Sequence, residues 1–324
     1  MSHVVVLAGG LSAEREVSLR SGRRVAAALQ LAGTETRVLD VDADLLATLA
    51  ADPPRAVVPL LHGAAGEDGA LREVLDTLGL PYVGAGAAAC RLAFDKAVAK
   101  TLLAAAGVRT PESVTLAHET FRQLGADAVL AAVVRRLGLP LMVRPTQGGS
   151  SLGASVVSAQ AELPGAMVAA FAYGHSLLIE RFVTGTEVAV GVLDGDDGPR
   201  SLPVVEIRPD SGRYDYAARY TAGATEFVVP AELAPEQLRG CAEVAVTAHR
   251  TLGLSHWSRS DLIVDPAGVP WFLEVNLAPG MTETSTYPLA LAAAGLDLGE
   301  VAAALISAVA PELDDRTNAF SRGR

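Results

Sequence analysis

A short strand, a glycine turn and a helix follow one another at the start of this chain, and this order constrains the fold most. Residues 4–7 are an apolar run, Gly9 and Gly10 follow it, and a helical pattern extends to about Leu31. Further strands are predicted at residues 36–41 and 56–60, each followed by a helical pattern. Strands that alternate with helices build parallel sheets. We therefore expect an α/β protein that begins with a parallel βαβ domain.

Composition excludes several classes of protein. The chain has 324 residues, of which 50% are hydrophobic, so it can build the cores of two or three domains. Its net charge of -11 argues against a nucleic-acid or anionic-membrane partner. The two cysteines, Cys90 and Cys241, lack metal-ligand spacing, so neither a disulfide framework nor a zinc site is indicated.

No segment has the pattern of a membrane span or a secretion signal. The apolar run at the N-terminus is short and has no basic leader. The Ala/Leu-rich stretch at residues 289–309 is interrupted by Asp297 and Glu300. These features predict a cytoplasmic protein.

A predicted hairpin near the C-terminus carries the strongest candidate site. Residues 271–276 alternate apolar and polar side chains, so Glu274 and Asn276 project from one face of a strand. A turn at residues 265–268 would fold the preceding strand back and add Asp261. Carboxylate and amide oxygens suit a hard cation such as Mg²⁺. The alternative is a hairpin whose polar residues face solvent, and the apolar neighbours of Glu274 argue against it.

Three loops are candidates for binding. The glycine-rich loop at residues 61–69 follows the third strand, where open α/β sheets bind ligands, and its His62 is either a structural partner or a catalyst. Residues 146–153 fit a flap over phosphates or a hairpin turn. Residues 208–227 form a long, polar segment, which indicates a lid or a disordered segment.

Taken by itself, Glu14 is an acid in the ordinary position at a helix N-terminus.

Changes in pattern near residues 92 and 185 divide the chain. We expect an N-terminal α/β substrate domain (1–92), a central part with the flap (93–185), a C-terminal part with the lid and the metal site (186–315) and a tail (316–324).

Eight motifs occur in one order along nearly the whole chain. They are GGLSAEREVSLRSG (9–22), HGAAGEDG (62–69), PYVG (81–84), DK (95–96), GSSLG (149–153), YDY (214–216), RSD (259–261) and EVNLAPGMT (274–282). One such motif is weak evidence, whereas eight in order are specific. Together they resemble the D-alanine:D-alanine ligases of the ATP-grasp superfamily. The resemblance implies a three-domain ATP-grasp architecture, with the nucleotide site between the central and C-terminal domains.

The resemblance implies an ATP-dependent ligase. Such an enzyme joins two D-alanines through a D-alanyl phosphate to give D-alanyl-D-alanine for peptidoglycan. It also implies ATP with two Mg²⁺ ions, Mn²⁺ being a possible substitute, and a homodimer.

A role for each matching residue follows from the same resemblance. The metal ligands would be Asp261, Glu274 and Asn276. The ATP-binding residues would be Lys96 and Arg144 at the phosphates, Ser151 in the flap, Glu180, Val183 and Glu187 at the adenine and ribose, and Arg219. The catalytic set would be Glu16 at the first ammonium with Ser150 and Tyr220 linked to it, Arg259 and Gly280 at the oxyanion, and Ser285 at the second carboxylate.

Four features depart from the family pattern. Arg144 and Arg219 stand where lysine is usual, and Gln147-Gly148 begins the flap. Thr286-Tyr287 follows Ser285 on the side of the second substrate, so a divergent ligase for another pair of small amino acids is the alternative function. A nucleotide-binding protein without turnover is a third interpretation, which the complete metal set disfavours.

Overall fold

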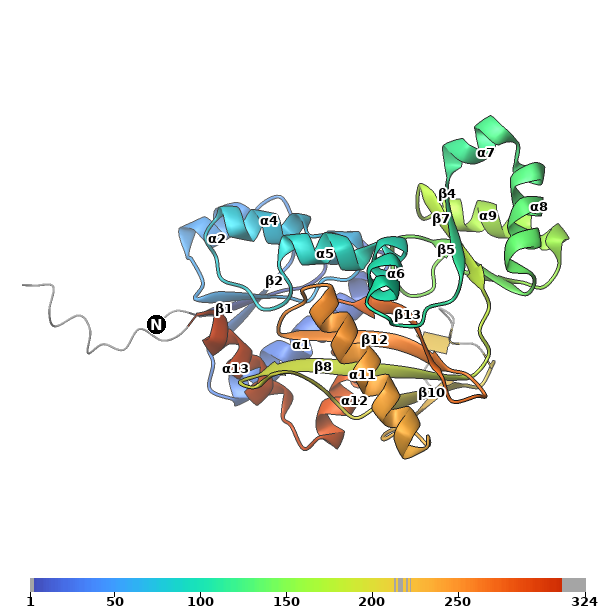
Figure 1. Ribbon diagram of the computed structural model, residues 1–324. Helices are drawn as coiled ribbons and strands as arrows, with labels where there is room; N and C mark the ends of the chain where they lie inside the picture. Colours follow the sequence, from blue (N-terminus) through green and yellow to red (C-terminus); the bar gives the residue numbers. More distant parts are fainter. Residues whose placement is uncertain (1–2, 213, 215–217, 220, 222, 311–324) are drawn as a thin grey trace, which may run out of the picture.

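Three sheets organise the chain, which the computed structural model describes at residues 3–212, 214, 218–219, 221 and 223–310 (Figure 1). The first sheet is parallel, with β1 (Val4–Leu7) between β2 (Thr36–Leu39) and β3 (Ala56–Pro59). Its helices are α1 (Arg15–Leu31), α2 (Leu45–Ala51), α3 (Ala64–Glu67), α4 (Ala70–Thr77) and α5 (Ala87–Phe94). All four residues of β1 are buried, as expected for a central parallel strand. The predicted parallel βαβ domain is confirmed.

The second sheet is antiparallel and stands with its helices at one end of the molecule (Figure 1). Its strands, in spatial order, are β4 (Ser113–Ala117), β7 (Ser176–Arg181), β5 (Leu141–Pro145) and β6 (Ser155–Val157). The helices beside it are α7 (His118–Leu124), α8 (Ala126–Leu137) and α9 (Leu163–Phe171), with a 3₁₀ turn at Gln160–Glu162. Helix α8 ends at Leu137, and β5 begins at Leu141.

The third sheet carries the predicted metal hairpin. Its strands, in spatial order, are β11 (Thr225–Val228), β10 (Val205–Pro209), β8 (Thr186–Gly195), β12 (Trp257–Val264) and β13 (Pro270–Asn276), and β9 (Gly198–Ser201) pairs with β8. The predicted hairpin is confirmed, since β12 and β13 are antiparallel neighbours. Helix α11 (Pro235–Thr251) covers one face of this sheet and α12 (Thr286–Ala293) covers the other.

The first and third sheets share hydrophobic cores, whereas the second has its own. Helix α13 (Leu298–Val309) packs on α1 (Figure 1), and Leu29 and Leu305 belong to one cluster with Trp257. Helix α6 (Lys96–Ala105) packs on the third sheet, where Leu103 shares a cluster with Phe272. The second sheet therefore shares no hydrophobic core with the other two among the described residues, and a cavity lies where it meets the third sheet.

Among the described residues, no single helix is both long and apolar enough to cross a bilayer. The helices α12 and α13 meet that test only as a pair, and the pair is bent by 98°.

Candidate active site

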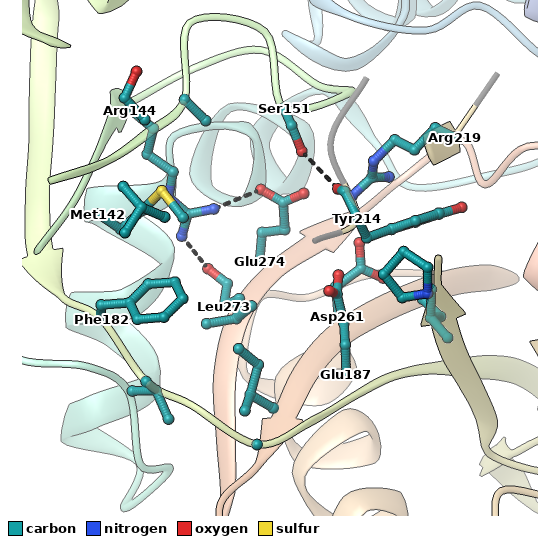
Figure 2. Close-up of a pocket in the computed structure, with 18 of the residues that line it drawn as sticks. Met142, Arg144, Ser151, Phe182, Glu187, Tyr214, Arg219, Asp261, Leu273 and Glu274 are labelled. Atoms are coloured by element: carbon teal, nitrogen blue, oxygen red, sulfur yellow. Dashed lines mark hydrogen bonds and ion pairs between the residues drawn. The ribbon is translucent and has the colours of Figure 1, made fainter. Parts of the chain in front are cut away.

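Two adjoining cavities lie where the sheets meet. The larger cavity, of about 770 Å³, lies between the second sheet and the strands β10, β12 and β13 of the third sheet (Figure 2). The smaller, of about 190 Å³, lies between the start of α1, the loop at residues 61–69 and the C-terminal end of β13. Both cavities are lined by Ile207, Tyr214, Arg219 and Asp261. They are therefore two compartments of one site.

Most of the residues predicted for ATP and metal come together in the larger cavity. Its lining includes Lys96, Arg144, Ser151, Val183, Glu187, Arg219, Asp261 and Glu274. The flap and the lid also meet here, because Ser151 Oγ donates to the Tyr214 carbonyl at 3.4 Å (Figure 2). Burial raises the pKa of Glu187 to about 7, although the nearby Arg219 opposes this shift.

Arg144, at the end of β5, points across the larger cavity to the metal hairpin (Figure 2). Its guanidinium donates to Glu274 Oε2 at 3.1 Å and to the Leu273 carbonyl at 3.0 Å. Lys96 Nζ donates to the Gly148 carbonyl at 2.5 Å and lies 3.5 Å from Glu274 Oε2. Burial alone would raise the pKa of Glu274, but Lys96 and Arg144 lead a group of cations that holds this pKa well below its usual range.

Glu180, predicted to lie at the adenine, is buried beside the larger cavity. This side chain is 2% exposed and does not line the larger cavity. Its carboxylate contacts Lys100 Nζ and lies 2.8 Å from Arg144 Nε. Two buried cations hold its side chain behind the cavity wall, and a role of Glu180 at the adenine stays a prediction. The carboxylate orients Arg144, and the guanidinium edge that remains faces Glu274.

The three predicted metal ligands lie together at the junction of the two cavities. Asp261 and Glu274 are direct partners across β12 and β13, and Asn276 Nδ2 lies 3.2 Å from Asp261 Oδ2. Among the described residues, no group of three His, Cys, Asp or Glu side chains could hold a metal ion alone. Two carboxylates and one amide suit Mg²⁺, which proteins usually share with phosphates and water rather than enclose. The donor set thus fits a cation that arrives with a nucleotide.

The start of α1 requires one correction. Ser150 Oγ donates to Glu14 Oε1, and a Cβ on Gly149 would lie 3.1 Å from Glu14 Oε2. Glu14 lines the smaller cavity, whereas Glu16 is exposed and does not. The acid that the flap contacts is therefore Glu14, and the predicted link from Glu16 through Ser150 is wrong.

Helix phase explains this correction and could have prevented it. The buried side of α1 includes Ser18, Ser21 and Val25, and a position four residues before Ser18 continues the same face. That position is Glu14. Glu16 lies two residues away, on the side that faces solvent.

The loop at residues 61–69 supplies two buried polar groups to the smaller cavity. His62 is 6% exposed, a hydrogen bond joins its ring to the Ala278 backbone, and its Nε2 has no partner among the described residues. Burial lowers the pKa of His62, so the ring is neutral at pH 7. Glu67 accepts from the Gly63 and Leu277 N–H groups at 2.9 and 3.3 Å, and burial raises its pKa to about 7. The glycines around both residues were the signal in the sequence.

The predicted residues of the second-substrate side also line the smaller cavity. Ser285 Oγ lies 2.8 Å from Thr282 Oγ1, and a Cβ on Gly280 would stand 2.8 Å from the same Ser285 oxygen. A side chain at position 280 would therefore displace the Ser285 hydroxyl. Of the altered pair, Thr286 lines this cavity, whereas Tyr287 lies in the core and donates to the Val192 carbonyl at 3.0 Å.

Two arginines connect the compartments. Arg259 forms a bidentate pair with Asp261, with Nε–Oδ1 and Nη2–Oδ2 distances of 2.7 and 2.8 Å. The Arg219 guanidinium lies 4.2 Å from the centre of the Tyr214 ring and borders both cavities. Tyr220, predicted to face Ser150, lies outside the described residues.

Comparisons with known proteins identify the family. Residues 102–307 match the family model described as D-ala D-ala ligase C-terminus. A curated D-alanine–D-alanine ligase from Gloeobacter violaceus is 42% identical over 300 residues, which cover 92% of this chain and 96% of that protein.

Solved structures of similar shape carry related names. The D-alanine–D-alanine ligase from Bacillus anthracis complexed with ATP has a TM-score of 0.79 and 26% identity, covering 96% of this chain and 97% of that one. The VanG D-Ala:D-Ser ligase from Enterococcus faecalis has a TM-score of 0.77 and 28% identity, covering 94% and 98%. The fold is thus the ATP-grasp ligase fold that the resemblance implied. By its family model and its curated relatives, the chain belongs to the D-alanine:D-alanine ligase family.

Proposed function

We propose that this protein is an ATP-dependent ligase that joins two D-alanines through a D-alanyl phosphate to give D-alanyl-D-alanine for peptidoglycan. The observation that carries the proposal is the shared wall of the two cavities, with Asp261 in both. A nucleotide in the larger cavity would present its terminal phosphate at this wall. Small amino acids in the smaller cavity would meet it there.

The larger cavity would hold ATP and the metal. Asp261, Glu274 and Asn276 would bind Mg²⁺, with two ions proposed and Mn²⁺ as a substitute, and the ion neutralises charge on the transferred phosphoryl group when bound. Lys96 and Arg144, now paired with Glu274, would turn to the phosphates. Val183, Glu187, Arg219 and Ser151 would line the nucleotide.

The smaller cavity would hold the amino acids. Glu14, not Glu16, would bind the ammonium group of the first D-alanine, because it is the acid held at the flap by Ser150. The neutral His62 would accept a hydrogen bond from an amine at Nε2. Ser285 would bind the second carboxylate, and Arg259 with the Gly280 N–H would stabilise the oxyanion. Tyr220 would complete the link from Ser150.

The proposed reaction has two steps, and the bonds formed and broken balance. A carboxylate oxygen of the first D-alanine attacks the γ-phosphorus of ATP, the bond to the β-γ bridging oxygen breaks, and ADP leaves. The amine of the second D-alanine then attacks the acyl carbon, a C–N bond forms, and inorganic phosphate leaves with the C–O electrons. The ammonium group of the second D-alanine gives up two of its three protons, one before the attack and one as the amide forms, and each turnover makes one dipeptide, one ADP and one phosphate.

Other features of the enzyme belong to the same proposal. We place it in the cytoplasm, where ATP is available, and expect a homodimer. We also propose the division at residues 92 and 185, in which the central part with its own core moves over the nucleotide.

Phosphate release from ATP with a panel of D- and L-amino acids tests the proposal. We expect release that requires D-alanine and Mg²⁺, with one dipeptide per phosphate by mass spectrometry. Phosphate release that requires an amino acid other than D-alanine would support the divergent ligase. ATP binding without release under all conditions would support the protein without turnover.

A further inference from the structure

The turn that follows the metal hairpin carries two groups of the proposed second step. Residues 277–285 connect β13 to α12 and belong to neither a helix nor a strand. They include Gly280, whose N–H is proposed for the oxyanion, and Ser285, which is proposed to bind the second carboxylate. Because no helix or sheet bonds fix this turn, its position depends on contacts with other elements.

Helix α1 holds the turn by its backbone. Arg24 Nη1 donates to the Met281 carbonyl at 3.1 Å and to the Thr282 carbonyl at 2.6 Å. The Met281 N–H donates to Ser21 Oγ at 3.0 Å, about one turn earlier in the same helix. Both backbone polar groups of Met281, the residue after Gly280, are therefore bonded to α1.

The Thr282 carbonyl connects Arg24 to the hydroxyl of Ser285. This carbonyl also accepts from the Ser285 N–H at 3.1 Å. Ser285 Oγ in turn accepts from the Thr282 N–H at 3.1 Å and lies 2.8 Å from Thr282 Oγ1. Arg24 thus acts on the same short turn that carries the Ser285 hydroxyl.

The Arg24 side chain makes no other polar contact among the described residues. Its hydrogen bonds are the two to the carbonyls, and no carboxylate there lies within ion-pair distance of its guanidinium. Arg24 lines neither cavity, so it acts on the site only through the turn. Arg20 and Glu283 join the same two segments at 3.5 Å, but both side chains are largely exposed, so this ion pair contributes little.

We propose that Arg24 is a positioning residue for the second step of the reaction. By fixing two backbone carbonyls of the turn, it holds the Gly280 N–H and the Ser285 hydroxyl where the second D-alanine binds. Hydrogen bonds from a charged donor are stronger than neutral ones, which suits this task. The inference rests on the proposed function. It predicts that loss of Arg24 slows the attack on D-alanyl phosphate and spares its formation.

The test measures how D-alanyl phosphate divides between two fates. It either returns to ATP or is attacked by the second D-alanine. The full chain is given Mg²⁺, subsaturating D-alanine and ATP whose β-γ bridging oxygen carries a heavy isotope. Each return to ATP can move this label to a nonbridging position, which phosphorus NMR detects, and mass spectrometry counts the dipeptide. The ratio of moved label to dipeptide does not depend on how much of the enzyme is folded.

Arg24→Met should raise this ratio about thirtyfold, because misplaced groups slow the second step alone. KM for ATP should stay within about twofold of wild type. Arg24→Lys should keep the ratio within about threefold of wild type, because both hydrogen bonds come from one nitrogen and an ammonium group can supply both.

Arg23→Met is the matched control. Arg23 is the exposed neighbour of Arg24, and its Nε donates to the Leu19 carbonyl of the same helix. The substitution removes the same charge and side chain, so the ratio should equal that of wild type. An unchanged ratio in Arg24→Met, an equal rise in Arg23→Met, or no recovery in Arg24→Lys would overturn the proposal.

Dipeptide formation by wild type keeps two failures apart. If wild type makes no dipeptide from ATP and D-alanine, the proposed function is wrong and the role of Arg24 falls with it. If wild type makes the dipeptide and Arg24→Met has the same ratio, only the role of Arg24 is wrong. Should Arg24→Met fail to fold, Arg24→Ala takes its place, because alanine has the highest helix propensity and this position is helical.

Discussion

Glu274 in the larger cavity and Glu67 in the smaller one are largely buried carboxylates in opposite electrostatic surroundings. Glu274 lies 3.1 Å from an Arg144 nitrogen and 3.5 Å from Lys96 Nζ, and its pKa is lowered. Glu67 has only backbone N–H partners among the described residues, and burial raises its pKa to about 7. The Glu274 carboxylate is thus held ionised in the larger cavity, whereas the pKa of Glu67 in the smaller cavity lies close to neutral pH.

This difference indicates what each compartment is prepared to receive. The larger cavity holds cations and anions that already neutralise one another. A metal ion and a phosphate can exchange places with these partners without leaving a buried charge alone. The smaller cavity is lined by His62 and Thr286, whose buried Nε2 and Oγ1 atoms have no hydrogen-bond partner among the described residues. It suits small zwitterions that bring their own charges.

The largest expected effect concerns the ionised member of the pair. Glu274→Gln should lower turnover roughly a thousandfold, because it removes an anionic metal ligand without a change of volume. The variant should fold like wild type, as measured by circular dichroism. The control is Glu236→Gln, an exposed glutamate in the first turn of α11 that should behave as wild type. Turnover within twofold of wild type at saturating Mg²⁺ would contradict the metal assignment.

Glu67 should make the free energy of unfolding depend on pH. The folded-state pKa of Glu67 lies above its ordinary value of 4.5, so its stabilising effect is complete below pH 4.5 and is lost as the pH rises through about 7. Between pH 5 and pH 8, wild type should lose about 2 to 3 kcal/mol of unfolding free energy relative to Glu67→Gln. Urea unfolding at both pH values measures this difference.

Glu274→Gln is the control for that measurement. Its lowered pKa places its pH dependence below pH 5, so this variant should follow wild type between pH 5 and pH 8. If Glu67→Gln also runs parallel to wild type, the two carboxylates do not differ as described.

A matched pair of variants tests the corrected acid at the flap. Glu14→Gln should lower kcat/KM for D-alanine about thirtyfold, because a neutral amide replaces the anion proposed for the substrate ammonium. Glu16→Gln changes an exposed residue and should stay within about twofold of wild type. Steady-state kinetics with D-alanine as the varied substrate separates them. The reverse order of effects would restore Glu16 to the site.

What the sequence could predict depends on how local the cause is. The β12–β13 hairpin follows from alternation and a turn within one stretch of chain, and it is confirmed. The place of Glu180 depends on Lys100, 80 residues earlier, and on Arg144 in the neighbouring strand. No local pattern contains that arrangement. The Thr286-Tyr287 pair was noticed as a departure, but only packing separates the cavity residue from the core residue.

Arg144→Lys should have a smaller effect, in one compartment only. A lysine ammonium cannot reach Glu180, Glu274 and the Leu273 carbonyl at once, so the fixed orientation of the cation is lost. We expect KM for ATP to rise about tenfold and KM for D-alanine to stay within twofold. The two constants are measured with the other substrate saturating. An effect confined to D-alanine would place Arg144 outside the nucleotide compartment.

The smallest expected effect separates the core from the cavity at adjacent residues. Tyr287→Phe removes the hydrogen bond to the Val192 carbonyl and should destabilise the protein by about 1 kcal/mol, or about 2 °C in Tm. The ring stays in place against Trp257, so KM for D-alanine should equal that of wild type. Thr286→Val should do the opposite, because Thr286 lines the smaller cavity and its buried hydroxyl has no partner among the described residues, so the variant should alter KM for D-alanine without loss of Tm. Thermal unfolding and steady-state kinetics with D-alanine as the varied substrate are run on both variants. A changed KM for D-alanine in Tyr287→Phe would mean that the second residue of the pair also shapes the smaller cavity, and the division between core and cavity would then fall beyond Tyr287.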